Sequence, residues 1–251
     1  LATFTWKDAT FIVTANEGDA REYFFDAADD AACTAAGGVS FDEDDGCLAY
    51  TDEVKVGDLV AEANSELAML QATGEADDLR VTTAMGDVDS DGEYDAAFTY
   101  GARSFTIWDQ NGLVVFDSGD DFERITASVH GAQFNNDNDV NAADSRSENK
   151  GPEPEAITVG QIGDRTYAFI GLERMGGIFV YDVTNPYDAQ FTEYVINRDL
   201  TEGLTSDDVI GDLAPESLVF VSAEDSPSGE ALLVVGNEVS GTVSVWQISQ
   251  L

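Results

Sequence analysis

Residues 154–182 read PEAITVGQIGDRTYAFIGLERMGGIFVYD, and the chain repeats this pattern in residues 215–248, PESLVFVSAEDSPSGEALLVVGNEVSGTVSVWQI. Each copy opens with Pro-Glu and runs through two apolar segments, joined by a polar turn that contains Gly, to a glutamate, Glu173 or Glu238. A third segment of alternating apolar residues follows. Short runs of this kind separated by turns are typical of antiparallel β-strands. The repeat therefore predicts an all-β fold built from β-propeller blades of four antiparallel strands.

Looser copies of the repeat precede these two. One occupies residues 1–25, where LATFTW and TFIVTANEG flank a turn at Lys7-Asp8. The other occupies residues 79–119 and contains the hairpin turn Asn111-Gly112. We therefore expect about three and a half to four blades, forming the C-terminal half of a larger propeller of about seven blades; closure of four blades alone is the alternative. An open arc has unpaired flanks, so the expected partner is the missing N-terminal half or a second copy in a homodimer.

The blade pattern is interrupted twice. We expect one partial propeller domain over residues 1–251, with a disulfide-bearing insertion at residues 26–78 and a long surface loop at residues 130–153. The insertion contains VGDLVAEANSELAMLQATG, in which apolar residues keep helical spacing and predict a short amphipathic helix.

The charge of the chain limits its partners. Its formal net charge is -39, from 50 acidic and 11 basic residues. A net negative charge of this size repels nucleic acid and anionic lipid and attracts cations. Most of these carboxylates are expected to form a solvated surface suited to saline, halophilic or marine surroundings, and only a few are expected to be ligands.

Cys33 and Cys47 bracket a Gly- and Asp-rich segment that lacks the further Cys or His of a zinc site. We therefore predict a disulfide between them, which places the protein outside the cytosol: extracellular, at the cell surface or in the periplasm. Two unrelated thiols are the alternative. The sequence has no apolar run long enough for a transmembrane segment, and we expect a secretion signal to have been removed upstream.

Residues 87–95 read DVDSDGEYD and favour a calcium site. Ca²⁺ takes six to eight hard oxygen ligands, and alternate acidic residues turn their carboxylates to one side of a tight loop. Gly92 permits the bend, and the twelfth position of an EF-hand, Phe98, is not acidic. We expect a structural calcium loop joining two strands of a blade. The predicted ligands are Asp87, Asp89, Asp91, Glu93 and Asp95.

A second acidic group follows from the predicted strand order. Glutamates begin inner strands or end the strands beside them, and antiparallel pairing brings these points to one end of the sheets. We expect a ring of carboxylates at the mouth of the central channel, opposite the calcium loop. Its members are Glu17, Glu155, Glu173, Glu216 and Glu238. A salt-bridge network, a metal site and a catalytic site are the three interpretations.

Other residues offer less specific signals. Arg174 follows Glu173, and Arg103 lies in the corresponding turn of the second blade. Both are expected to neutralise the ring or to bind an anionic group. His130 has no companion nucleophile and is interpreted as structural. Trp108, Tyr181 and Trp246 hold matching places and are interpreted as sheet-packing residues.

Several segments resemble the choice-of-anchor I family of secreted bacterial proteins. They are TANEGDAREY (14–23), GARSFTIWD (101–109), KGPEPE (150–155), GLERMGGIFVYDVTNP (171–186), DLAPESL (212–218) and GNEVSGT (236–242). The resemblance covers most of the chain and implies an exported β-propeller. Related sequences often carry an alkaline phosphatase or phytase-like esterase label.

The resemblance leaves two functions open. We favour a calcium-binding surface module with a binding or structural role. The alternative is a calcium-dependent phosphoesterase at the acidic mouth, and no residue identifies itself as its nucleophile. The catalytic candidates for that alternative are Glu155, Glu173, Arg174, Glu216 and Glu238.

Overall fold

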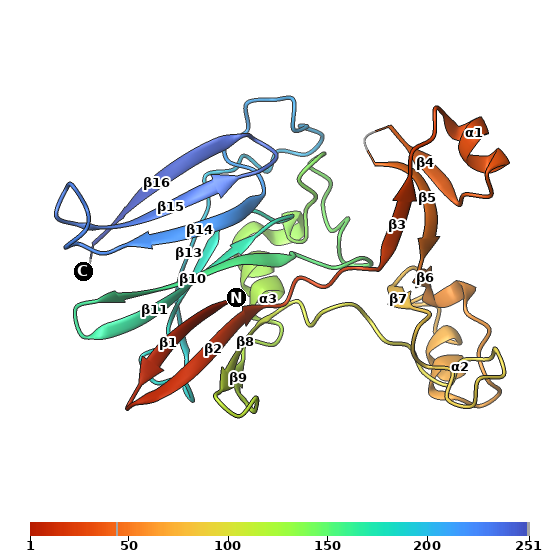
Figure 1. Cartoon of the computed structure of the whole chain (residues 1–251), viewed down its shortest axis with the longest axis horizontal. Helices are drawn as coiled ribbons and strands as arrows, with labels where there is room; N and C mark the ends of the chain where they lie inside the picture. Colours follow the sequence, from red (N-terminus) through yellow and green to blue (C-terminus); the bar gives the residue numbers. More distant parts are fainter. Residues whose placement is uncertain (44, 250–251) are drawn as a thin grey trace. The chain divides into compact units, whose positions relative to one another are not determined.

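The computed structural model describes residues 1–43 and 45–249 and divides into two compact units (Figure 1). The first, here called the blade unit, comprises Leu1–Glu17 and Gly101–Leu251. The second, the insert unit, is Gly18–Tyr100. The insert unit contains the predicted insertion, residues 26–78, and extends beyond it at both ends. In the described residues, no helix has the length and apolar composition needed to cross a membrane.

The blade unit is built from antiparallel sheets, and in each of them a strand pairs with the next strand that the chain supplies to that sheet. Sheet 1 contains β1 (Ala2–Trp6), β2 (Ala9–Ala15), β8 (Phe105–Asp109) and β9 (Val114–Asp117). Sheet 2 contains β10 (Pro154–Ile162), β11 (Arg165–Leu172), β12 (Ile178–Asp182) and β13 (Gln190–Val195). Sheet 3 contains β14 (Pro215–Val221), β15 (Ala231–Asn237) and β16 (Thr242–Ile248). The all-β class and the four-stranded antiparallel sheets predicted from the repeat are confirmed.

Alternation along the strands explains how the sheets pack. In sheet 1, Phe11 and Val13 of β2 and Ile107 of β8 face a core that also contains Ile170 and Phe179 of sheet 2. The opposite face of sheet 2 packs on sheet 3 through a second set of apolar residues, among them Phe169, Ile178, Leu233 and Val235. Sheet 2 is therefore covered on both faces, which is the stacking expected of neighbouring propeller blades (Figure 1).

The prediction that residues 79–119 form one blade is wrong. Its first strand, β7 (Arg80–Thr82), pairs with β6 (Glu53–Lys55) inside the insert unit. Its later strand, β8, pairs with β2 and completes sheet 1. Apolar alternation identifies a strand but not the strand with which it pairs, so a segment inserted between β2 and β8 was mistaken for part of a blade.

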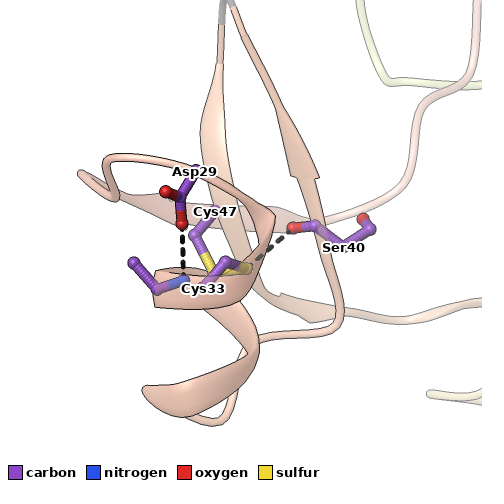
Figure 2. The surroundings of a disulfide bond; sticks show 5 residues. Asp29, Cys33, Ser40 and Cys47 are labelled. Carbon is purple, nitrogen blue, oxygen red and sulfur yellow. Dashed lines mark hydrogen bonds between the residues drawn. A yellow bond between two sulfur atoms is a disulfide. The ribbon is translucent and has the colours of Figure 1, made fainter.

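The insert unit has a disulfide at one end and a small core at the other. Its sheet is formed by β3 (Glu22–Phe25), β5 (Gly46–Thr51) and β4 (Ser40–Asp42). The predicted disulfide joins Cys33 of α1 (Asp30–Ala35) to Cys47 of β5, with Asp29 capping the helix (Figure 2). A Cβ atom at Gly38 would lie 2.1 Å from Cys47 Sγ, so only glycine fits against the bond.

The core of the insert unit contains a shorter helix than its spacing predicts. A single 3-10 turn, η1 (Val56–Asp58), is separated from α2 (Glu66–Gln71), whose first turn is capped by Ser65. Apolar side chains from both segments and from β7 pack together. Tyr94, in the predicted calcium loop, packs against this core and so attaches the loop to it.

The segment after sheet 1 is folded inward. The helix α3 (Asp121–His130) packs Phe122 into the main core, and the 3-10 turn η2 (Gly131–Gln133) follows it. The predicted surface loop over residues 130–153 then carries side chains that are less than 2% exposed: Asn135, Asn136, Asn138, Asn141 and Glu153. Its polar composition did not predict this burial, which hydrogen bonding makes possible.

Candidate metal centre

The positions of the glutamates follow from strand register. In sheet 2, Pro154 of β10 lies opposite Leu172 of β11, and the Glu173 amide donates to the Glu153 carbonyl over 2.7 Å. Sheet 3 repeats this arrangement, with the Glu238 amide donating to the Ala214 carbonyl over 2.8 Å. The end of one strand and the start of its neighbour therefore meet at the same sheet end, as the repeat predicts.

The pairing register is irregular at the start of each inner strand, where its glutamate lies. The register shifts between Pro154 and Ile157 in β10, and between Pro215 and Ser217 in β14, so Glu155 and Glu216 lie in bulges. The residues before the two prolines, Glu153 and Ala214, have φ of 52° and 57°. Bulges and left-handed residues other than glycine cost free energy and recur beside functional sites, where they aim a side chain.

Three carboxylates from distant parts of the sequence meet here, in what we call the blade-end cluster. Glu17 follows β2, Glu153 precedes β10 and Glu173 follows β11. One oxygen from each can be chosen so that all lie within 4.8 Å of one another. Glu153 is 1% exposed and Glu173 is 8% exposed, so the cluster lies largely out of solvent.

The electrostatics of the cluster also involve the other predicted members of the ring. Burial, together with repulsion from Glu17, Glu216 and Glu238, raises the pKa of Glu155 to about 7. Burial likewise raises the pKa of Glu173, and Glu153 and Glu155 add to the effect while Arg174 opposes it. The carboxylates of the predicted ring are thus close enough to influence one another.

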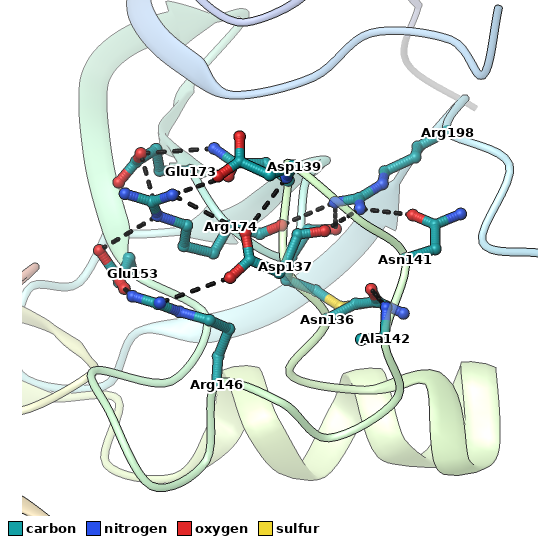
Figure 3. Close-up of polar contacts among 12 residues, drawn as sticks. Asn136, Asp137, Asp139, Asn141, Ala142, Arg146, Glu153, Glu173, Arg174 and Arg198 are labelled. Carbon is teal, nitrogen blue, oxygen red and sulfur yellow. Dashed lines mark hydrogen bonds and ion pairs between the residues drawn. The ribbon is translucent and has the colours of Figure 1, made fainter. Parts of the chain in front are cut away.

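Two arginines partly compensate the cluster (Figure 3). Arg174 Nε lies 3.2 Å from Glu173 Oε1 and 3.6 Å from Glu153 Oε2, and Arg174 Nη1 donates to Asn138 Oδ1 over 2.7 Å. Arg146 Nη2 donates to Glu153 Oε1, and its Nη1 lies 3.4 Å from Asp137 Oδ2. Arg174 lowers the pKa of Glu173, but the burial of that carboxyl outweighs the effect and its pKa stays raised.

A third arginine holds the segment that supplies Asp137. Arg198 is buried and donates to the Arg174 carbonyl over 2.7 Å, to Asn141 Oδ1 over 2.6 Å and to the Asp137 carbonyl. Burial lowers its pKa to about 10, while Asp137 favours the charged form. Arg198 therefore holds the polar segment after α3, which contributes its acids and amides to the same site (Figure 3).

The donor set of the blade-end cluster suits a hard divalent cation. Carboxylate and amide oxygens are the ligands of Ca²⁺ and Mg²⁺, and neither histidine nor thiolate is present among the residues named here. A bound cation would favour the ionised form of each carboxylate and remove the repulsion that raises the pKa of Glu155.

The second acidic group, which we call the Asp loop (residues 87–95), is held by its own backbone. Asp87 accepts from the amides of Asp91 and Gly92 at 3.2 and 3.0 Å, and Asp95 accepts from the Val88 amide at 3.1 Å. Gly92 has φ of 93°, as the bend requires. Oxygens of Asp87, Asp89 and Asp91 lie within 4.8 Å of one another, and Asp89 and Asp91 are exposed.

The predicted location of the Asp loop is wrong, because it lies in the insert unit and joins no two strands of a blade. The loop is anchored instead by backbone bonds from Tyr94 to Val60 and from Asp95 to Gly86, at 2.7 and 2.8 Å. The sequence also missed Glu62. Partial burial and the nearby Glu93 and Asp91 raise its pKa, so it adds another carboxylate to this group.

Other predicted residues lie elsewhere. Arg103 does not join the cluster and instead donates to Glu123 and to two carbonyls of the loop after α3. His130 ends α3 and stacks edge-on against Tyr194, and burial lowers its pKa. Trp108, Tyr181 and Trp246 all lie on third strands, in equivalent register.

Sequence reasoning missed Glu153, Arg146 and Asp137. Glu153 has Ala214 as its counterpart in the other copy, so comparison of the repeats did not indicate an acidic residue at this position. Its place directly before a Pro-Glu start was the signal that could have found it. Arg146 and Asp137 lie in the irregular segment, where no periodicity predicts a position.

These features define a disulfide-bearing all-β protein of blade-like sheets with an acidic site at the strand ends. The chain matches the choice-of-anchor I domain over residues 1–186 and belongs to that family. It is also 29% identical over 188 residues to gigasin-3a of Magallana gigas, a match that covers 69% of this chain and 64% of gigasin-3a. The chain thus spans less than two thirds of that relative. No solved structure matches it significantly. The family and the disulfide indicate an extracellular or cell-surface protein.

Proposed function

We propose that the chain is a calcium-binding module of a secreted or surface β-propeller, with a structural or ligand-binding role. The observation that carries this proposal is the meeting of Glu17, Glu153 and Glu173 within 4.8 Å in a largely buried site. Burying several carboxylates together costs free energy unless protons, arginines or a cation compensate them. Arg146 and Arg174 compensate in part, and a calcium ion would supply the remaining positive charge.

We propose that a bound ion stabilises a different part of the chain in the blade-end cluster than in the Asp loop. In the cluster, a cation would join β2, β10 and β11 at the sheet ends. In the Asp loop, the ligands would be Asp87, Asp89, Asp91, the Glu93 carbonyl and Asp95. Glu62 would be a further carboxylate close to them. An ion there would stabilise the insert unit alone.

Calorimetric titration with calcium tests both sites. Glu173→Gln is expected to abolish the binding that belongs to the blade-end cluster, and Asp89→Asn the binding that belongs to the Asp loop. The exposed Glu224→Gln and Asp58→Asn are matched controls, since each removes one negative charge from a residue that is not among the proposed ligands. Equal loss of binding in a site variant and its control would mean that calcium associates non-specifically with the negatively charged surface.

A calcium-dependent phosphoesterase is the second candidate function. It is favoured by Glu155, whose pKa of about 7 suits a proton-transferring group, and by Arg174, which is 27% exposed and lies beside the cluster. Against it, Arg174 is already held by Glu173 and Asn138.

A chromogenic phosphate ester, assayed with calcium and with chelator, separates the two functions. Calcium-dependent turnover that disappears in Glu155→Gln but persists in Glu224→Gln would establish the enzyme. No turnover across pH and divalent metals is the result that the binding or structural function predicts.

A further inference from the structure

An asparagine precedes the glutamate at the second strand's end in two of the three blade sheets. Asn16 follows β2 in sheet 1 and comes directly before Glu17. Asn237 ends β15 in sheet 3 and comes directly before Glu238. In sheet 2 the corresponding residue is the buried Leu172, at the end of β11. Sheets 1 and 3 therefore share a polar strand end that sheet 2 replaces with an apolar one.

The side chain of Asn16 joins the end of β2 to β8. Its Nδ2 donates to Ser104 Oγ over 3.0 Å and to Thr106 Oγ1 over 2.7 Å. Its Oδ1 accepts from Thr14 Oγ1 over 2.9 Å, and its backbone amide donates to the Ser104 carbonyl over 2.9 Å. These bonds extend the attachment of β2 to β8 beyond the last pair of their ladder.

The hydroxyl protons fix the direction of this network. Thr106 Oγ1 donates to Asp117 Oδ2 over 2.5 Å, and Ser104 Oγ donates to the same oxygen over 3.2 Å. The two hydroxyl oxygens therefore accept from Asn16, and a side chain at that place must offer two N–H donors. Ser104 and Thr106 are 0% and 3% exposed, so water cannot replace a lost partner without cost.

Sheet 3 repeats the network with different residues. Asn237 Nδ2 donates to Thr242 Oγ1 over 3.1 Å and to Ser244 Oγ over 3.3 Å. Thr242 Oγ1 in turn donates to Asp212 Oδ1 over 2.6 Å. The carboxylate behind the hydroxyls comes from β9 in sheet 1 and from the segment before β14 in sheet 3. Because different elements complete the same arrangement, the asparagine belongs to the strand end itself.

In sheet 1 the network takes the place of a turn. A backbone bond from the Gly176 amide to the Leu172 carbonyl, at 2.8 Å, closes the turn after β11. A bond from the Gly241 amide to the Glu238 carbonyl, at 3.1 Å, closes the turn after β15. After Glu17 the chain instead enters the insert unit, although β2 and β8 pair with each other (Figure 1). The end of β2 is thus held to β8 by side-chain bonds.

We propose that Asn16 is a positioning residue for the blade-end cluster and holds Glu17 where it can share a cation with Glu153 and Glu173. The inference rests on the calcium site proposed for that cluster. Asn16 would supply no ligand oxygen, because its Oδ1 already accepts from Thr14. Groups that orient metal ligands typically change metal affinity by roughly 10- to 100-fold when they are replaced.

Calorimetric titration with calcium in the Asp89→Asn background tests the inference, because that background leaves the blade-end cluster as the site that is measured. Asn16→Ala is expected to weaken binding roughly 10- to 100-fold. Asn237→Ala is the matched control, since it removes the same kind of bonds in sheet 3 but precedes a glutamate outside the group of three carboxylates. It is expected to leave the calcium affinity unchanged.

A double-mutant cycle tests whether Asn16 acts through the network. Thr106→Val removes the hydroxyl that accepts from Asn16 and keeps the shape of the side chain. We expect it to weaken calcium binding, and we expect Asn16→Ala to have little further effect in its presence, because both changes remove one interaction. Additive effects of the two changes would overturn the proposed role of the network.

The reference variant Glu173→Gln separates failure of this inference from failure of the calcium site. If Glu173→Gln abolishes binding while Asn16→Ala binds calcium as tightly as Asn237→Ala, the positioning role is overturned and the calcium site stands. Equal weakening by the two asparagine changes would also overturn it, since the effect would then be a general one of strand-end bonds. If no calcium binding depends on Glu173, the calcium site fails and the inference fails with it.

Discussion

The blade-end cluster and the Asp loop are both acidic, but they are assembled in different ways. The cluster joins Glu17, Glu153 and Glu173 from distant segments, buries two of them and places Arg146 and Arg174 beside them. The Asp loop takes its acids from nine consecutive residues, exposes Asp89 and Asp91 and satisfies its carboxylates with its own amides. Spacing along the chain reveals the second kind of group, whereas the first kind depends on which strands pair.

The blade-end cluster should respond more strongly than an exposed ion pair when an arginine is removed. Arg146→Met leaves Glu153, which is 1% exposed, without its closest counter-charge. We expect a loss of about 3–5 kcal/mol in the free energy of unfolding, because an uncompensated buried charge is costly. Denaturant unfolding measures this loss. Arg124→Met, which breaks a pair with a 60% exposed arginine, is the control and should cost less than about 1 kcal/mol. Similar losses would contradict the burial argument.

Removing the disulfide tests whether the two groups reside in units of separate stability. Replacing Cys33 and Cys47 by alanine opens a loop with a sequence separation of 14 residues. We expect the insert unit to lose about 3 kcal/mol, from the entropy gained by its unfolded chain. Hydrogen exchange should show lower protection in β5 and α1 and unchanged protection in β10 and β11. An equal loss in the blade strands would mean that the two units unfold together.

The pH dependence of stability should come from Glu155, which lies two residues after Glu153 of the cluster. The pKa of Glu155 in the folded chain, about 7, lies above the value of about 4.3 expected when unfolded, so the folded state binds the proton more tightly. Stability without calcium should therefore fall as pH rises between these values, by roughly 1–2 kcal/mol once solvent screening is allowed for. Melting curves of Glu155→Gln should lack this fall, and those of Glu224→Gln should keep it. Retention of the fall in Glu155→Gln would assign it to other groups.

The smallest effect is expected in the Asp loop without metal. Asp89 is exposed, so Asp89→Asn should change stability by less than about 0.5 kcal/mol in the presence of chelator. With calcium, the unmodified chain should gain stability that the variant does not, because a ligand that binds the folded state alone raises its stability. Thermal unfolding with and without calcium measures both. A large loss under chelator would show that Asp89 supports the loop by itself.

Much of the blade unit was predictable because its strands are periodic. Both Pro-Glu copies form the expected strands, and the turn at Lys7-Asp8 has the positive φ angles, 48° and 65°, of a tight hairpin. The helix α3 was missed, because its apolar positions lie among acidic residues that resemble a loop. The half-ring expectation and the number of blades in the intact protein remain predictions.

The sequence by itself determined the β-strands, the disulfide between Cys33 and Cys47 and the meeting of glutamates at strand ends, because period, cysteine spacing and antiparallel pairing are local rules. Only the tertiary structure decided that β8 returns to β2 after the insert unit, and that Arg146 and Glu153 complete the acidic site. The choice of a partner across a long insertion depends on which surfaces can be buried together. The strand that pairs with β2 therefore cannot be predicted from any short stretch of sequence.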